Sequence, residues 1–230
     1  MEQNLIPDPK CISCLLIFDF DDTLANTNLF TEFSNNKPKF EKFLDSNQSF
    51  CQTFFNDFFL MHELFTTLVT KYNFKICIAS FGFQSMIEEY IKISYGFDLI
   101  NKTDITGTNG IKSSTGMFTT AFSENYNIHP KYNMKVCKNS IIKKFMADNQ
   151  VSSSDTIFFD DDAHNISEAV SNANGPQLPR QNTINVPKGQ LQIDLVISAI
   201  NKWCGTDPLN ETKYNVRKYI GRSVLRKKYL

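Results

Sequence analysis

Six aspartates stand directly behind two apolar segments of this chain. Asp19, Asp21 and Asp22 follow "LLIF", and the run at 160–162 follows "TIFF". Acids crowded at the end of a buried strand repel one another, and each makes its neighbour harder to ionise. They persist as carboxylates when a hard cation lies between them, and Mg²⁺ suits a few carboxylates together with water and phosphate oxygens. The spacing therefore predicts a site for a hard cation, with Mg²⁺ as the natural candidate.

An alternation of strands and helices would bring these acids together. Apolar segments of strand length occupy 14–20, 74–80, 155–162 and 182–187. Apolar residues at helical spacing occupy 62–72, 85–95, 139–147 and 193–203. Strands that alternate with helices form a mostly parallel sheet covered on both faces. We expect an α/β fold, a Rossmann-like three-layer sandwich.

Ligands of such sheets collect at the carboxyl ends of the strands. The acids at 19–22 and 160–162 lie at two such ends, and Ser80 lies at a third. Helix capping is an alternative for single residues, since Asp22, Thr23 and Asp162 each precede a possible helix. A calcium loop is another alternative, but its sixth position requires glycine, where this chain has Leu24.

Three motifs in this order resemble a known family. "IFDFDDTLANT" resembles the first motif of the haloacid dehalogenase-like (HAD) superfamily, "ICIAS" its second and "IFFDDDAHN" its fourth. The third motif is a lysine chosen by position. The resemblance covers the frame from Cys14 to Trp203. It implies a phosphatase, and the pair Asp160-Asp161 in place of Gly-Asp is similar to the magnesium-dependent phosphatase-like branches.

The resemblance also implies roles for individual residues. Asp19 would be the nucleophile that forms an aspartyl-phosphate, and Asp21 the general acid and base. Mg²⁺ would bind the Asp19 carboxylate, the main-chain carbonyl of Asp21, and Asp161. Ser80 would donate a hydrogen bond to a phosphate oxygen. The second acid, Asp21, favours phosphate chemistry over carbon–halogen cleavage.

The supporting residues are expected nearby. Lys138 opens the helix before the "TIFF" strand and is the preferred lysine of the third motif, with Lys135 and Lys112 as competitors. Thr23 is expected to steady the turn and Asn165 to support Asp161, while Asp160 either binds the metal or supports it. Asp22 is expected to point away from the cluster.

The predicted catalytic core comprises 11–25 and 61–204. A Phe-rich segment, 26–60, is predicted to form a small helical cap insertion. Residues 101–136 carry "TGTNG" and "SSTG" and are predicted to be irregular or hairpin-like. Residues 205–230 form a basic tail, with seven basic residues and no acid after Glu211.

The expected function is Mg²⁺-dependent hydrolysis of a phosphomonoester. Phe81 and Phe83 lie beside the phosphate site in sequence, so an aryl phosphate such as phosphotyrosine of a phosphoprotein is one substrate class, unless both rings belong to the core. The alternatives are a small-metabolite phosphatase, a phosphotransferase, and a phosphate-binding scaffold without turnover.

Composition restricts the setting. Lys plus Arg and Asp plus Glu number 24 each, so net charge favours no partner. The six cysteines suit reduced thiols, residues 1–10 do not resemble a secretory signal, and no run is long enough to cross a bilayer. We expect a soluble, intracellular, cytoplasmic protein. The tail is predicted to bind an anionic membrane surface or to be a solvated helix, and nucleic acid is the less expected partner.

Overall fold

The computed structural model describes residues 13–26, 54–112, 118–121, 138–205 and 211–220, with the backbone alone for 108–112 and 118–121. Its centre is a six-stranded sheet of order β4-β3-β2-β1-β5-β6. The strands are β1 (Cys14–Phe18), β2 (Phe74–Phe83), β3 (Ile105–Lys112), β4 (Phe118–Ala121), β5 (Thr156–Asp160) and β6 (Thr183–Asn185). All neighbours are parallel except β3 and β4. The two acid-bearing strands, β1 and β5, are therefore adjacent at the centre.

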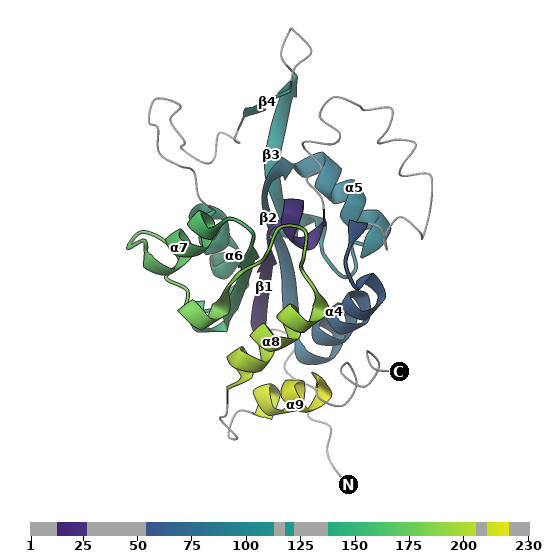
Figure 1. Ribbon diagram of the computed structural model, residues 1–230, viewed down its shortest axis with the longest axis vertical. Helices are drawn as coiled ribbons and strands as arrows, with labels where there is room; N and C mark the ends of the chain where they lie inside the picture. Colours follow the sequence, from purple (N-terminus) through teal and green to yellow (C-terminus); the bar gives the residue numbers. More distant parts are fainter. Residues whose placement is uncertain (1–12, 27–53, 113–117, 122–137, 206–210, 221–230) are drawn as a thin grey trace.

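Helices cover both faces of the sheet, which confirms the predicted three-layer α/β fold. They are α4 (Phe58–Tyr72), α5 (Gln84–Ser94), α6 (Asn139–Asn149), α7 (Ala163–Ser171), α8 (Ile193–Cys204) and α9 (Glu211–Tyr219). Short turns of helix are η1 (Phe20–Leu24), η2 (Lys102–Asp104), η3 (Ser153–Asp155) and η4 (Arg180–Asn182). In Figure 1, α6 and α7 lie on one side of the sheet and α4 and α5 on the other.

The alternation of side chains along β1 divides the core in two. Leu16 and Phe18 belong to the larger cluster, with residues of α4, α5 and α8. Leu15 and Ile17 belong to the smaller cluster, with residues of α6 and α7. Each of these side chains is fully buried. Burying one stabilises the fold by about 1.5–3 kcal/mol, so β1 is firmly held where it ends at the acids.

The helix α9 packs on the core through its apolar face. Val216 and Ile220 are fully buried, and α9 contacts both α8 and α4. At its start, Lys213 lies 4.5 Å from the Trp203 ring centroid and 3.5 Å from Asp155 Oδ1, which also accepts a hydrogen bond of 3.1 Å from Trp203 Nε1. Val216 and Ile220, two apolar residues of the predicted tail, therefore pack against the domain itself. No helix in the described ranges is long and apolar enough to cross a membrane.

Two predicted segments fall partly outside the described residues. The Phe-rich segment is described only from 54 onward, where Phe54 and Phe55 are buried beside the rings of Tyr90 and Tyr95. The cap prediction for 27–53 concerns residues outside the described ranges. In the segment 101–136, β3 and β4 pair as antiparallel strands, and β3 also extends the parallel sheet beside β2.

Candidate active site

A cavity of about 540 Å³ lies at the carboxyl ends of the central strands. Its described lining consists of Asp19, Asp21, Asp22, Ser80, Phe81, Gly82, Lys138, Asp160, Asp161, Asp162, Ala163, Asn165 and Lys188. The backbone N–H of Asp19 donates to the carbonyl of Phe159 over 2.9 Å, which holds the ends of β1 and β5 side by side. The strand order therefore brings together the acids that the sequence places 141 positions apart, at 19 and 160.

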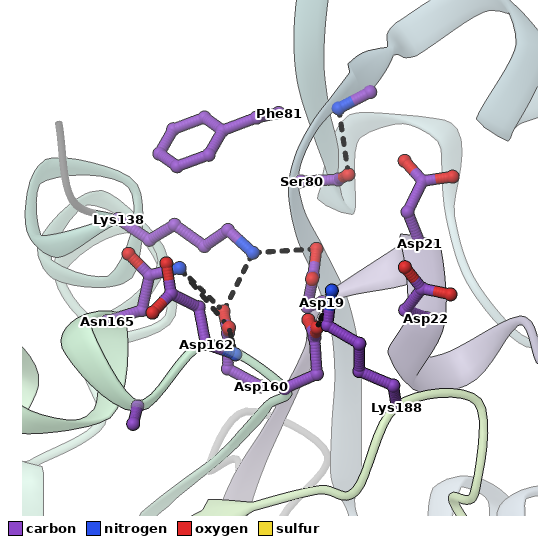
Figure 2. Close-up of a pocket in the computed structure, with 13 residues that line it drawn as sticks. Asp19, Asp21, Asp22, Ser80, Phe81, Lys138, Asp160, Asp162, Asn165 and Lys188 are labelled. Atoms are coloured by element: carbon purple, nitrogen blue, oxygen red, sulfur yellow. Dashed lines mark hydrogen bonds and ion pairs between the residues drawn. The ribbon is translucent and has the colours of Figure 1, made fainter. Parts of the chain in front are cut away.

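Lys138 joins the two strand ends. Its Nζ lies 2.6 Å from Asp19 Oδ1 and 2.7 Å from Asp160 Oδ2 (Figure 2). The side chain is 2% exposed, because the helix α6 begins directly after it and directs it into the sheet edge. Burial lowers the pKa of Lys138, but the two carboxylates raise it by more than burial lowers it. The pKa is therefore raised overall, and the side chain stays a charged ammonium. The side chains of Lys112 and Lys135, the competing lysines, are outside the described residues.

Both carboxylate oxygens of Asp160 accept hydrogen bonds. Its Oδ1 accepts from the N–H of Asp162 over 2.8 Å, and Asn165 Nδ2 lies 3.2 Å from each of its oxygens. With Lys138 on Oδ2, both oxygens of this fully buried carboxylate have donors. Asn165, which the sequence placed in support of Asp161, contacts Asp160 instead. Asp160 thus acts as the anchor of Lys138.

Three carboxylates converge beside this lysine. Ligand oxygens of Asp19, Asp160 and Asp161 lie within 4.8 Å of one another. Burial raises the pKa of Asp19, with Lys138 opposing and Asp160 adding to the rise. Burial also raises the pKa of Asp161, and the charges of Asp160 and Asp22 add to it. The single buried ammonium of Lys138 faces three carboxylates, so it cannot neutralise all of their negative charge.

The residues present fit a hydrated divalent cation. The donors are carboxylate oxygens, which Mg²⁺ prefers. Asn165 Oδ1 is buried at the cavity wall without a hydrogen-bond partner among the described residues, and a metal-bound water would satisfy it. Because Asp160 is already saturated with donors, Asp19 and Asp161 are the carboxylates best suited to bind the metal.

The turn after β1 separates its acids. Asp21 has extended torsions (φ −67°, ψ 132°), whereas Asp22 is left-handed (φ 58°, ψ 6°). Thr23 Oγ1 accepts from the N–H of Asp161 over 3.0 Å, which ties this turn to the end of β5. Asp22 lines the cavity, contrary to the expectation that it points away, although it is not part of the carboxylate triad.

The opposite wall comes from an irregular stretch of β2. The pairing with β3 is interrupted between Ala79 and Phe83, which frees the intervening residues to face the cavity. Ser80 is 1% exposed, and its Oγ accepts from the N–H of Gly82 over 3.0 Å. Since that bond uses a lone pair, the hydroxyl proton is available to donate. Figure 2 shows Asp21 beside Ser80, on the side of the cavity opposite Lys138.

The two phenylalanines around this stretch differ. The ring centroid of Phe81 lies 5.3 Å from Lys138 Nζ, and the residue lines the cavity. Phe83 is buried and 8% exposed. Only Phe81 is thus placed to contact a ligand, and Phe83 belongs to the core.

Sequence reasoning missed Lys188 and Gly82. The Nζ of Lys188 lies 3.9 Å from Asp161 Oδ2, and its side chain is 77% exposed. Its position directly behind the strand at 182–187 was a usable signal, because β6 ends at the same sheet edge. Gly82 lies beyond the predicted strand at 74–80, and only the structure, in which β2 continues to Phe83, reveals a strand glycine that other groups approach closely.

Comparisons with known proteins gave matches among solved structures only. No protein-family model and no curated protein matches the chain. A phosphoserine phosphohydrolase-like protein from Francisella tularensis subsp. tularensis SCHU S4 is 17% identical, with a TM-score of 0.46 over 80% of this chain and 98% of that chain. A phosphoserine phosphatase, solved as an analogue of its phospho-aspartyl intermediate, is 18% identical, with a TM-score of 0.39 over 67% of this chain and 81% of that chain.

A third match bears the family name that the motifs resemble. The HAD family hydrolase t0658 from Salmonella enterica subsp. enterica serovar Typhi is 12% identical, with a TM-score of 0.44 over 77% of this chain and 64% of that chain. At these identities and TM-scores, the function of this chain has to be derived from the geometry of its own site.

Proposed function

We propose that this chain is a Mg²⁺-dependent phosphomonoester hydrolase of the HAD-like superfamily that works through an aspartyl-phosphate. The observation that carries the proposal is the buried bridge from Lys138 to Asp19 and Asp160, beside a third carboxylate and opposite Asp21. An acid anchored by an ammonium at a cavity wall is oriented for attack, and the same ammonium can offset charge on a bound phosphate.

Each residue has a task in the two steps. A carboxylate oxygen of Asp19 attacks phosphorus, the bond from phosphorus to the ester oxygen breaks, and Asp21 gives its proton to the departing oxygen. Asp21 then takes a proton from water, the water oxygen attacks phosphorus, and the bond to Asp19 breaks with release of phosphate. Ser80 donates a hydrogen bond to a phosphate oxygen, and Lys138 keeps Asp19 in place.

Mg²⁺, held by Asp19 and Asp161, would offset the charge between nucleophile and phosphate. The main-chain carbonyl of Asp21 is the third protein ligand that we propose. Thr23 supports Asp161 through its backbone, and Asp160 supports the site through Lys138.

An aryl phosphate, such as phosphotyrosine of a phosphoprotein, is the substrate class that we propose. The support is Phe81, whose ring forms part of the cavity wall beside Lys138. A flat leaving group packing on this ring would gain about 0.5–1.5 kcal/mol beyond its buried area. Small-metabolite phosphates are the alternative, and a phosphotransferase would use the same residues with another acceptor.

A reducing, cytoplasmic location fits the cysteines. Cys14, Cys77 and Cys204 are free and buried, and burial raises the pKa of each thiol, that of Cys204 to about 11. Such thiols are inert, as is common in a reducing compartment. The membrane prediction for the tail now depends on residues beyond 220, which lie outside the described ranges.

Hydrolysis of phenyl phosphate, phosphotyrosine peptides and alkyl phosphates, with Mg²⁺ or with a chelator, tests the proposal. Turnover should require Mg²⁺ and disappear in Asp19→Asn, while Asp148→Asn on the surface of α6 should match the wild type. Acid quenching followed by borohydride reduction should convert the phosphorylated Asp19 to homoserine, identified by peptide mass spectrometry.

Three outcomes would overturn the proposal. Undiminished turnover in Asp19→Asn would remove the nucleophile. Phosphate binding without turnover of any ester would indicate the scaffold instead, and transfer to an added alcohol at the expense of water would indicate the phosphotransferase.

A further inference from the structure

Gly82 lines the cavity between the side chains of Asp21 and Ser80, two residues of the proposed mechanism. A Cβ built on it would come within 3.0 Å of Asp21 Oδ2, a distance that real Cβ atoms essentially never show. The same Cβ would lie 3.3 Å from Ser80 Oγ and 3.4 Å from Ile87 Cδ1. The carboxylate of Asp21 therefore rests in space that any side chain at position 82 would fill.

The reason for glycine here is steric and not conformational. Gly82 is absent from the described residues with positive φ, so alanine could adopt its backbone torsions. Its N–H is kept in alanine and would still donate to Ser80 Oγ. The atom that blocks a side chain is the end of the Asp21 side chain, which can rotate away at little cost to the fold.

We infer that Gly82 is a positioning residue, which reserves the place of the Asp21 carboxylate beside Ser80. The inference rests on the proposed function, because it assigns a consequence to the location of the general acid. With any larger residue at 82, the Asp21 side chain would rotate out of its position. Proton transfer to the leaving oxygen would then be impaired while the protein still folds.

The dependence of kcat/KM on the leaving group tests this. Proton donation matters most for a poor leaving group such as phenol and least for an acidic one such as 4-nitrophenol. Phenyl phosphate and 4-nitrophenyl phosphate have similar shapes, so binding differences largely cancel. Because kcat/KM ends at the first irreversible step, it reports transfer to Asp19 and excludes the later attack by water.

Gly82→Ala should lower kcat/KM on phenyl phosphate by about tenfold or more and on 4-nitrophenyl phosphate by less than about threefold. Asp21→Asn should show the same selectivity with a larger loss, about 10²–10⁴-fold on phenyl phosphate. In the Asp21→Asn background, Gly82→Ala should add little, since the displaced group no longer donates a proton. Gly205→Ala, a strained substitution (φ +61°) outside the cavity lining, is the control for a general loss of stability.

Equal losses on both substrates, or a full effect of Gly82→Ala in the Asp21→Asn background, would overturn the inference. So would a Gly82→Ala protein without a cooperative melt, because the geometry predicts that it folds. If Asp21→Asn itself lacks leaving-group selectivity while the wild type turns over, the proposed role of Asp21 fails, and that result is separate from the others.

Discussion

Replacing Lys138 by methionine removes one charge from the buried bridge and nearly preserves its volume. The ammonium is the cation that Asp19 and Asp160 share, at 2.6 and 2.7 Å, in a place that is 2% exposed. Breaking a buried pair by removing one partner costs about 3–5 kcal/mol, since the remaining charge is left without compensation. We expect Lys138→Met to lose about 3 kcal/mol at pH 8 without metal, which corresponds to roughly 6–12 °C for a chain of this size.

The loss should depend on pH in a defined direction. Lys138 opposes the rise that burial imposes on the pKa of Asp19, so the variant should raise this pKa further. A raised pKa means that the folded state binds the proton more tightly than the unfolded state. The stability of the variant therefore falls as pH rises from about 4, the ordinary aspartate value, through the raised value. The deficit relative to the wild type should be small near pH 4–5 and complete at pH 8.

Urea unfolding followed by the fluorescence of Trp203, the single tryptophan, measures this. Lys144→Met is the matched control, since Lys144 pairs with Asp148 at the exposed surface of the same helix and should lose at most about 0.5 kcal/mol. Adding Asp160→Asn to Lys138→Met should restore at least about 1 kcal/mol by removing the uncompensated charge. A Lys138→Met protein that melts within about 2 °C of the wild type, or a double variant less stable than the single one, would refute the reasoning.

Three further changes have expected outcomes. Gly189→Ala should lose about 2 kcal/mol in thermal unfolding, because the residue has φ +63° and a Cβ would lie 2.5 Å from the carbonyl oxygen of Asn26; an unchanged melt would contradict this. Lys188→Ala should tighten Mg²⁺ binding about threefold in calorimetry at low salt, because Nζ competes for Asp161 at 3.9 Å, and the difference should vanish at high salt. Burial raises the pKa of Asp155, but hydrogen bonds and the charge of Lys213 outweigh burial and leave the pKa lowered. The contribution of this carboxylate to the free energy of unfolding is therefore present above pH 4 and lost as the pH falls below it. Asp155→Asn should cost roughly 0.5 kcal/mol at pH 7, and an equal cost at pH 2 would contradict the assignment.

The site residues that could be predicted from the sequence are those that lie at the carboxyl ends of strands. In a parallel sheet, register alone brings the last residues of adjacent strands together, so Asp19, Ser80 and Asp161 could be placed without coordinates. Lys138 could be placed because a helix that returns to the sheet begins at the same edge. The fold class was predictable for the same reason, since apolar runs and helical spacing alternate along most of the chain.

The parts that were not predictable depend on contacts between side chains. Asn165 is four residues from Asp161 and five from Asp160, and only the local turn decides that it contacts Asp160. Asp22 was expected to point away, but the left-handed torsion at this residue turns the chain so that it lines the cavity. The segment with "TGTNG" was predicted to be irregular or hairpin-like, and β3 and β4 do pair as antiparallel strands. The parallel pairing of β3 with β2 was not predicted, because the turn pattern gives no sign of it and tertiary pairing outweighs the local preference.

The charge of the cavity shows why the cation is essential to the proposed chemistry. The described lining holds six aspartates and two lysines, a formal charge of −4, although the whole chain is neutral. Even with Lys138 offsetting part of the charge, a phosphate dianion would enter a cavity whose net charge has its own sign. A divalent cation held by Asp19 and Asp161 would offset part of this negative charge, and phosphate oxygens would supply it with further ligands. The acids crowded behind the first strand thus make metal and substrate depend on each other: neither is expected to bind tightly without the other.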